Sequence, residues 1–253
     1  MTEFTADTFF NGQITVRQSV SGYRFSIDAV ILANLAAIKP GDRILDMGTG
    51  CGIIPMIIAY RHPEIASIFG VDLQKDLAEI AGYNVRQNRM VDRITILHAD
   101  FKMLTPGHTQ GPVDLVIGNP PHYPPNSGRI NPDTQRALAR HEIAMTLADF
   151  METARRMLGR GGRLLIIYPA ERLVDLLNEM RWAGIEPQRL QLIYPRPGAE
   201  ARLVVAEGIA GKRPAFKISP PLYIHDADGN YTPEIKVMFS PDRQPTTKSP
   251  AGG

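Results

Sequence analysis

The sequence predicts an α/β fold: a mostly parallel sheet of seven strands with helices on both faces, closed by an antiparallel hairpin. Two observations predict it. From residue 42 onward, short apolar runs alternate with stretches of helical periodicity, which is typical of a parallel sheet wrapped by helices. The connection at 195–200 is too short for a crossover helix, so the last two strands are expected to pair antiparallel.

The expected elements follow each other from the first strand to the closing hairpin. Strands are predicted at 44–47, 67–72, 94–99, 113–118, 163–168, 189–194 and 202–207, and helices at 53–61, 75–88, 147–158 and 171–182. Pro63 stops the first helix, and Gly159 with the Gly161 and Gly162 pair closes the third. Asp228 followed by Gly229 indicates a small hairpin nearer the C-terminus.

We divide the chain by these signals into an N-terminal segment (1–40), a core (41–210), a small extension or hairpin (211–240) and a disordered tail (241–253). The single cysteine permits no internal disulfide, and neither a secretory signal nor an apolar run long enough for a bilayer is present, so we expect a cytoplasmic protein without a membrane role. A net charge of +2 requires any nucleic-acid surface to be local.

A glycine-rich loop follows the first predicted strand, with the sequence Asp46-Met47-Gly48-Thr49-Gly50-Cys51-Gly52. Glycines let the backbone approach a ligand, and the amides that start the next helix can face it, so we expect a nucleotide cofactor here. The dinucleotide fingerprint separates its last two glycines by two residues, whereas here only Cys51 intervenes. Cys51 could serve as a thiolate nucleophile, but with no base nearby in sequence it is expected only to be small.

Acidic residues follow the next two strands. Asp72 is expected to accept hydrogen bonds from both ribose hydroxyls, with Leu73 beside it. Asp100 is expected to accept from an adenine amino group, and Phe101 to pack against its ring. The alternative is that Asp72 and Asp100 simply cap the helices that follow.

The fourth strand runs directly into Asn119-Pro120-Pro121-His122. An exocyclic amino nitrogen is a poor nucleophile, because its lone pair is delocalised. The Asn119 side-chain oxygen and the Pro120 carbonyl can accept its N–H groups and stabilise the charge that develops during attack. This pattern indicates methylation of a nitrogen without a metal, although the segment could be only a turn.

These two motifs resemble motif I and the Asn-Pro-Pro-aromatic motif IV of the class I S-adenosylmethionine-dependent methyltransferases, whose fold is Rossmann-like. Three further segments are similar to the bacterial family that methylates adenine N6 at position 37 of a valine tRNA: Gly22-Tyr23-Arg24-Phe25-Ser26-Ile27-Asp28-Ala29, Ser127-Gly128-Arg129 and Ala139-Arg140-His141-Glu142. The resemblance implies S-adenosylmethionine as cofactor, tRNA as substrate, and an N-terminal segment that lines the cofactor and substrate entrance.

By this resemblance, two segments would contact the substrate. The substrate-binding residues would be Tyr23, Arg24, Phe25, Tyr123, Arg129, Arg136 and Arg140. The three later arginines could meet RNA phosphates or lie on a solvated helix face. His122 departs from the family pattern, which has a larger aromatic residue there, and Tyr123 could replace it.

Other functions remain open from the sequence. A protein glutamine amide could be the substrate of the same Asn-Pro-Pro chemistry, but those enzymes carry a longer helical domain before motif I. DNA adenine methylation is a third possibility, but this sequence has no sizeable target-recognition domain, which weakens it. The chain could also be a cofactor-binding or RNA-binding protein without catalysis, against which the intact Asn119 speaks.

Overall fold

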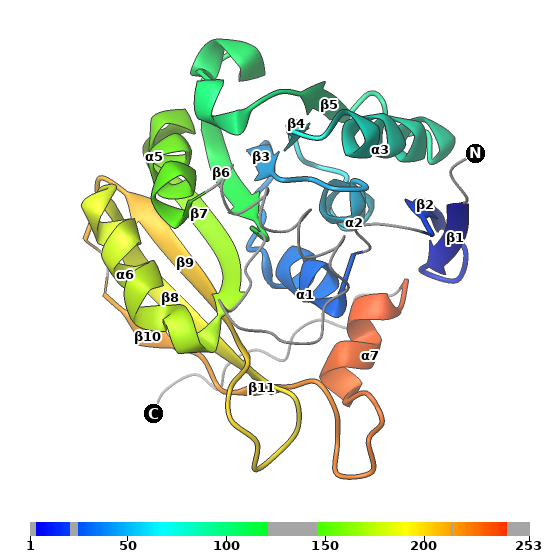
Figure 1. Cartoon of the computed structure of the whole chain (residues 1–253), viewed down its shortest axis with the longest axis vertical. Helices are drawn as coiled ribbons and strands as arrows, with labels where there is room; N and C mark the ends of the chain where they lie inside the picture. Colours follow the sequence, from blue (N-terminus) through cyan, green and yellow to red (C-terminus); the bar gives the residue numbers. More distant parts are fainter. Residues whose placement is uncertain (1–3, 21–24, 121–145, 214, 242–253) are drawn as a thin grey trace, which may run out of the picture.

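The computed structural model describes residues 4–20, 25–120, 146–213 and 215–241. Figure 1 shows a large sheet between two layers of helices, with a separate two-stranded hairpin near the N-terminus. The strands of the large sheet are β3 (Arg43–Met47), β4 (Ser67–Asp72), β5 (Ile94–His98), β6 (Val113–Gly118), β7 (Leu158–Pro169), β8 (Ile185–Tyr194), β9 (Leu203–Ala210), β10 (Lys217–Ile218) and β11 (Leu222–Tyr223). Their order is β10-β8-β9-β7-β6-β3-β4-β5, with β11 also on β8.

The predicted seven-stranded sheet with a closing antiparallel hairpin is confirmed in strands β3 to β9. β9 pairs antiparallel with both β7 and β8, whereas the pairs β3–β4, β4–β5, β3–β6 and β6–β7 are parallel. The two extra strands, β10 and β11, are only two residues long and pair parallel with β8. They enlarge the sheet at one edge without changing its class.

Helices cover both faces of this sheet. They are α1 (Ile27–Leu35), α2 (Ile53–Arg61), α3 (Lys75–Gln87), α5 (Leu147–Met157), α6 (Leu173–Trp182) and α7 (Pro233–Phe239), with short 3-10 turns η1 (Phe101–Met103), η2 (Pro106–Thr109) and η3 (Ala170–Arg172). Figure 1 shows α5 and α6 on one side and α1, α2, α3 and α7 on the other. No helix in the described segments has the length and apolar character that a bilayer span requires.

The core divides into two apolar clusters because successive residues of a strand point to opposite faces. Ile44 belongs to the cluster under α1 and α2, whereas Leu45 belongs to the one under α5 and α6. Phe150 of α5 packs so tightly on β6 that a Cβ added at Gly118 would lie 2.5 Å from its Cζ. Glycine at that position therefore sets how closely α5 approaches the strand that leads to Asn119.

One predicted strand begins earlier than expected. The sequence predicts that Gly159, Gly161 and Gly162 close the third helix, and α5 does end at Met157. The next strand, expected from residue 163, instead starts at Leu158 and runs through all three glycines. Leu158 pairs with Val113, and the register between β6 and β7 then shifts before Leu115, which accommodates the irregular stretch. Tertiary pairing with β6 thus overrides the local tendency of glycine to break a strand.

The N-terminal hairpin, β1 (Phe4–Phe9) and β2 (Ile14–Ser19), is absent from the sequence prediction, as are α1 and α7. The signal for the hairpin is the Asn11-Gly12 turn, where both residues have positive φ of 54° and 83°. Further on, His225 and Tyr231 form one antiparallel bridge around Asp228 and Gly229, and α7 follows. The region 211–240 therefore holds two short strands, this bridge and a helix.

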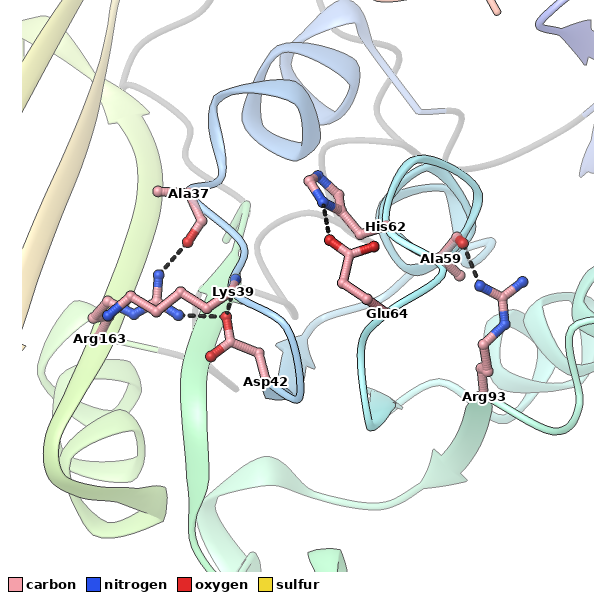
Figure 2. A network of polar contacts seen from close by, with 8 residues as sticks. All are labelled: Ala37, Lys39, Asp42, Ala59, His62, Glu64, Arg93 and Arg163. Atoms are coloured by element: carbon pink, nitrogen blue, oxygen red, sulfur yellow. Dashed lines mark hydrogen bonds and ion pairs between the residues drawn. The ribbon is translucent and has the colours of Figure 1, made fainter. Parts of the chain in front are cut away.

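Buried polar contacts fasten the amino-terminal edge of the sheet (Figure 2). Arg163 of β7 forms an ion pair with Asp42, and both side chains are less than a tenth exposed. Arg163 also donates to the Ala37 carbonyl, and Asp42 accepts from the Lys39 amide at 2.7 Å. Because these groups are mutually satisfied, the edge opposite the glycine-rich loop is held rigid.

Candidate functional site

The candidate site lies at the carboxyl edge of the sheet, where β3, β4 and β6 end side by side. In the parallel register, Met47 pairs with both Val71 and Gly118. The next residues, Gly48 and Asn119, are therefore at the same level. The two motifs, far apart in the sequence, meet because the carboxyl ends of neighbouring parallel strands share one edge.

Backbone contacts hold the glycine-rich loop on the end of β4. The amides of Gly48 and Thr49 both donate to the Val71 carbonyl at 2.9 Å. The Gly50 amide donates to Oδ2 of Asp72, also at 2.9 Å. The loop is thus shaped by the neighbouring strand before any ligand binds.

Glycine is required at two positions of this loop for different reasons. Gly50 has a φ of 57°, in the left-handed region where side chains are disfavoured. Gly52 has a φ of 83°, caps the start of α2, and would place a Cβ 3.3 Å from the Cβ of Ala81. A larger residue at Gly52 would push α3 away from the loop.

Asp46 is completely buried beneath the loop. Burial raises the pKa of its carboxyl to about 7; the nearby Thr49 hydroxyl works in the opposite direction, and the charge of Asp72 raises the pKa further. Thr49 approaches without reaching hydrogen-bond geometry, so neither Asp46 oxygen nor Thr49 Oγ1 has a hydrogen-bond partner among the described residues. Unsatisfied buried oxygens are costly, and a donor from a bound ligand would relieve that cost.

Asp72 is buried at the end of β4, and both of its oxygens already receive backbone donors. Oδ2 accepts from Gly50 and Oδ1 accepts from the Gln74 amide at 2.9 Å. Each carboxylate oxygen can accept a second hydrogen bond, so ribose hydroxyls can still be bound. Leu73, the next residue, is 41% exposed beside it.

Asp100 and Phe101 lie after β5. The Asp100 carboxylate accepts from the Lys102 amide at 2.9 Å and caps η1, which matches the capping alternative for this residue. Phe101 is 3% exposed and packs against Phe150, with ring centroids 6.5 Å apart. Its ring belongs to the core under α5, so contact with an adenine would involve only the edge left uncovered.

Of the amino-group clamp, the structure describes Asn119, which is half-buried, and Pro120, which is buried. Pro121 and His122 lie outside the described residues, as do the expected substrate residues Tyr23, Arg24, Tyr123, Arg129, Arg136 and Arg140. Phe25 is described, and its amide donates to Gln18 Oε1 at 3.0 Å while its ring packs on Phe9. This contact joins the start of α1 to the N-terminal hairpin.

Cys51 is buried in the loop, and burial raises the pKa of its thiol to about 12. A thiol with this pKa stays protonated at neutral pH and is a poor nucleophile. The expectation that Cys51 is simply a small residue in the loop fits this environment. No group of three or more metal-ligating side chains is found in the described part of the chain.

Sequence reasoning missed Asn84, a fully buried residue on α3 that touches the loop. Its side-chain nitrogen donates to the Cys51 carbonyl at 2.9 Å and to the Arg17 carbonyl at 3.0 Å. Its oxygen accepts from the Arg17 amide at 2.9 Å. The only signal in the sequence was an asparagine inside an apolar helix face.

A groove of about 1490 Å³ opens at the carboxyl end of β7. It runs between the turn from β8 to β9 and the C-terminal extension. Carboxylates outnumber guanidinium groups among the residues that line it: Asp28, Glu171, Glu200, Asp226 and Asp228 against Arg196 and Arg202. This lining favours a ligand rich in donors over a run of phosphates.

Known proteins of similar sequence and fold agree with this arrangement. The methyltransferase small domain model matches residues 26–179. A tRNA1(Val) (adenine(37)-N6)-methyltransferase of Porphyromonas gingivalis is 30% identical over 93% of this chain and 94% of its own length. The enzyme of the same name from Tolumonas auensis is 28% identical over 89% and 92%.

Two solved structures show the same fold. A predicted O-methyltransferase of Agrobacterium tumefaciens has a TM-score of 0.66 at 23% identity, covering 83% of this chain and 94% of its own. A putative class I S-adenosylmethionine-dependent methyltransferase of Listeria monocytogenes has a TM-score of 0.55 at 15% identity, covering 86% and 71%. With the family match over most of the sheet, the chain belongs to the methyltransferase small-domain family and is a class I S-adenosylmethionine-dependent methyltransferase.

Proposed function

We propose that this protein methylates the exocyclic N6 amino group of an adenine in tRNA, at position 37 of the anticodon loop. The observation that carries the proposal is the similarity to enzymes of that name over about nine tenths of both chains. We place the reaction in the cytoplasm, where translation uses tRNA. A base in a loop is already accessible and costs little to extrude.

The residues at the carboxyl edge fit S-adenosylmethionine. Asp46 and Thr49 offer buried oxygens that lack partners among the described residues, and the glycine backbone of the loop leaves room for close approach. We assign Asp46, Gly48, Thr49, Gly50 and Gly52 to the amino-acid part of the cofactor. Asp72, Leu73, Asp100 and Phe101 are assigned to its ribose and adenine.

Asn119 and Pro120 would hold the amino group that receives the methyl. When bound, the cofactor would supply a methyl group attached to a cationic sulfur. Transfer of the methyl breaks the carbon–sulfur bond and leaves the sulfur as a neutral thioether. The Asn119 side-chain oxygen and the Pro120 carbonyl accept the two N6–H groups, turning the nitrogen lone pair toward that carbon. As the N–C bond forms, positive charge on nitrogen strengthens both hydrogen bonds, and the surplus proton then passes to solvent.

The substrate can be tested directly. The protein is incubated with methyl-labelled S-adenosylmethionine and unmodified bacterial tRNA, with a translation termination factor in a parallel reaction, and labelled products are identified by mass after digestion. We expect N6-methyladenosine from the tRNA. Label only on a glutamine of the factor would replace this proposal with protein methylation, and label in neither would refute it.

Asn119→Ala tests the clamp. We expect kcat to fall by about 100-fold or more, because an acceptor that strengthens in the transition state is lost, while cofactor affinity stays within about twofold. Single-turnover methylation and calorimetric titration measure the two quantities. Asn178→Ala, an exposed change on α6, is the control and should match the parent. An Asn119→Ala enzyme as fast as the parent would rule out the clamp.

A further inference from the structure

The N-terminal hairpin is fixed to α3 by two asparagines spaced one turn apart. Asn88 accepts from the Thr15 amide at 2.9 Å and donates to the Thr15 carbonyl at 2.8 Å. Asn84 makes the same pair of contacts with Arg17, at 2.9 and 3.0 Å. Each side-chain amide thus replaces the peptide of a neighbouring strand. The outer edge of β2 is paired, and the hairpin has one position relative to α3.

This position fixes the side chain of Arg17 between two aromatic rings. Its guanidinium carbon lies 3.5 Å from the ring centroid of Phe4 and 4.8 Å from that of Tyr83. The rings are 38% and 39% exposed, so the stack is open to solvent. Cation–π contacts orient the guanidinium without neutralising it, and no described carboxylate forms an ion pair with Arg17.

Two more arginines extend this charge along α3. Arg86 lies one turn beyond Tyr83, on the same side of the helix, and Arg89 follows the end of the helix. Both are exposed, and neither has an ion-pair partner in the described segments. Three other arginines, Arg172, Arg181 and Arg189, are each paired with a carboxylate, whereas the exposed Arg155, Arg160 and Arg196 also lack an ion-pair partner among the described residues. What sets Arg86 apart is therefore its position one turn from Tyr83 and the stacked Arg17.

The hairpin–α3 surface, defined as Phe4, Arg17, Tyr83, Arg86 and Arg89, is connected to the glycine-rich loop through Asn84. Asn84, which brackets Arg17, also donates to the Cys51 carbonyl in the glycine-rich loop. In the groove at the carboxyl end of β7, carboxylates outnumber guanidinium groups. An extended polyanion whose loop enters the site would be attracted toward the hairpin and repelled by the groove.

We propose that the hairpin–α3 surface binds the phosphate backbone of the substrate RNA outside the methylated nucleotide. The inference rests on the proposed function, because it assumes an RNA substrate. Guanidinium groups bind phosphate oxygens in a bidentate manner, and the faces of Phe4 and Tyr83 can stack on an unpaired base. Such contacts position the RNA without reading its sequence.

The test measures binding of a fluorescent unmodified tRNA transcript to the full chain at several salt concentrations. We expect Arg17→Gln with Arg86→Gln to weaken binding roughly 10-fold near 0.1 M salt, and to reduce the slope of log K against log salt by about 1 to 2. Cofactor affinity and kcat at saturating tRNA should not change. Arg181→Gln, which alters an arginine already paired with Glu186, is the matched control.

The Arg17 side chain also packs between Phe4 and Tyr83, so its replacement could destabilise the hairpin. Arg86→Gln alone therefore separates an effect on RNA binding from an effect on folding. This single change touches neither ring, and it should lower the salt slope while thermal unfolding stays as in the parent. If only Arg17→Gln weakens RNA binding, and does so together with a loss of stability, the surface is structural and the inference is wrong. If the protein methylates tRNA but the slope of log K against log salt is unchanged in both the double variant and Arg86→Gln, the inference alone is overturned. A protein that methylates no RNA overturns the proposed function as well.

Discussion

At the scale of single residues, Asp46 shows how strand burial sets a protonation state. Desolvation at the end of β3 raises the pKa of its carboxyl from the ordinary 3.8 to about 7. The folded state therefore holds a proton that the unfolded chain releases near pH 4. This contribution to the free energy of unfolding is present in full below about pH 4, falls as pH rises toward about 7, and is absent above it.

We expect cofactor affinity to increase as pH rises through about 7, because the ionised Asp46 carboxylate attracts the cationic cofactor. Asp46→Asn should bind the cofactor weakly and without this pH dependence, and its unfolding free energy should fall less between about pH 4 and 7. Calorimetric titration and urea unfolding across that range measure both effects. Asp175→Asn, an exposed control on α6, should behave like the parent. An unchanged pH profile in Asp46→Asn would show that another group titrates.

At the scale of elements, α3 does more than cover the sheet. One face packs on it, and Asn84 and Asn88 complete the edge of β2. Asn84 alone continues to the glycine-rich loop, through the Cys51 carbonyl. The hairpin, the helix and the glycine-rich loop therefore share one buried side-chain amide, whose oxygen and nitrogen are both hydrogen-bonded.

Asn84→Asp keeps the acceptor toward the Arg17 amide and removes both donors. We expect the Kd of S-adenosylmethionine to rise roughly 10-fold or more, because a carboxylate then faces the Cys51 carbonyl where a donor stood. Asn88→Asp is the matched control: it loosens Thr15 but does not touch the loop. Hydrogen exchange of the β2 amides should increase in both variants, while calorimetry should show weaker cofactor binding only in Asn84→Asp. Equal cofactor affinity in the two would contradict this link.

At the scale of the whole molecule, the N-terminal hairpin and the last helix pack together against α2. The rings of Phe9 and Phe239 stack at 5.9 Å. Arg61, at the end of α2, donates to the carbonyls of Val237, Met238 and Ser240 at 3.0 to 3.1 Å. Its guanidinium also lies over the Phe10 ring, so one side chain joins three segments.

Arg61→Ala should lower the free energy of unfolding by about 2 to 3 kcal/mol, since charge-assisted hydrogen bonds to the carbonyls at the end of α7 are lost together with the contact to Phe10. Urea unfolding measures it. Cofactor affinity should be unaffected, because these contacts are remote from the carboxyl edge of the sheet. Arg155→Ala, an exposed change on α5, should cost less than about 0.5 kcal/mol. A similar loss in both variants would show that Arg61 does not hold α7.

The sequence by itself determined the sheet and where the candidate site residues lie on it. Strand β6 and helix α2 have the bounds that the local pattern predicts, 113–118 and 53–61. The glycine-rich loop, Asp72 and Asn119 meet at one edge because each directly follows a parallel strand, which is a property of chain order alone. Hydrophobic periodicity is a local signal, so it can be read without knowing what lies next to it in space.

Only the tertiary structure decided how the N-terminal hairpin attaches to α3, where β7 begins, and how deeply the Asp46 carboxyl is buried. Arg17 and Asn84 are 67 residues apart, and no local pattern announces that a helix will complete a strand edge. The sequence places the start of the strand after the glycines, at residue 163, yet pairing with β6 extends β7 back through them to Leu158. The pKa of Asp46 likewise depends on burial by surrounding elements. These features arise from contacts between distant segments, whose free energy outweighs local propensity once the chain has folded.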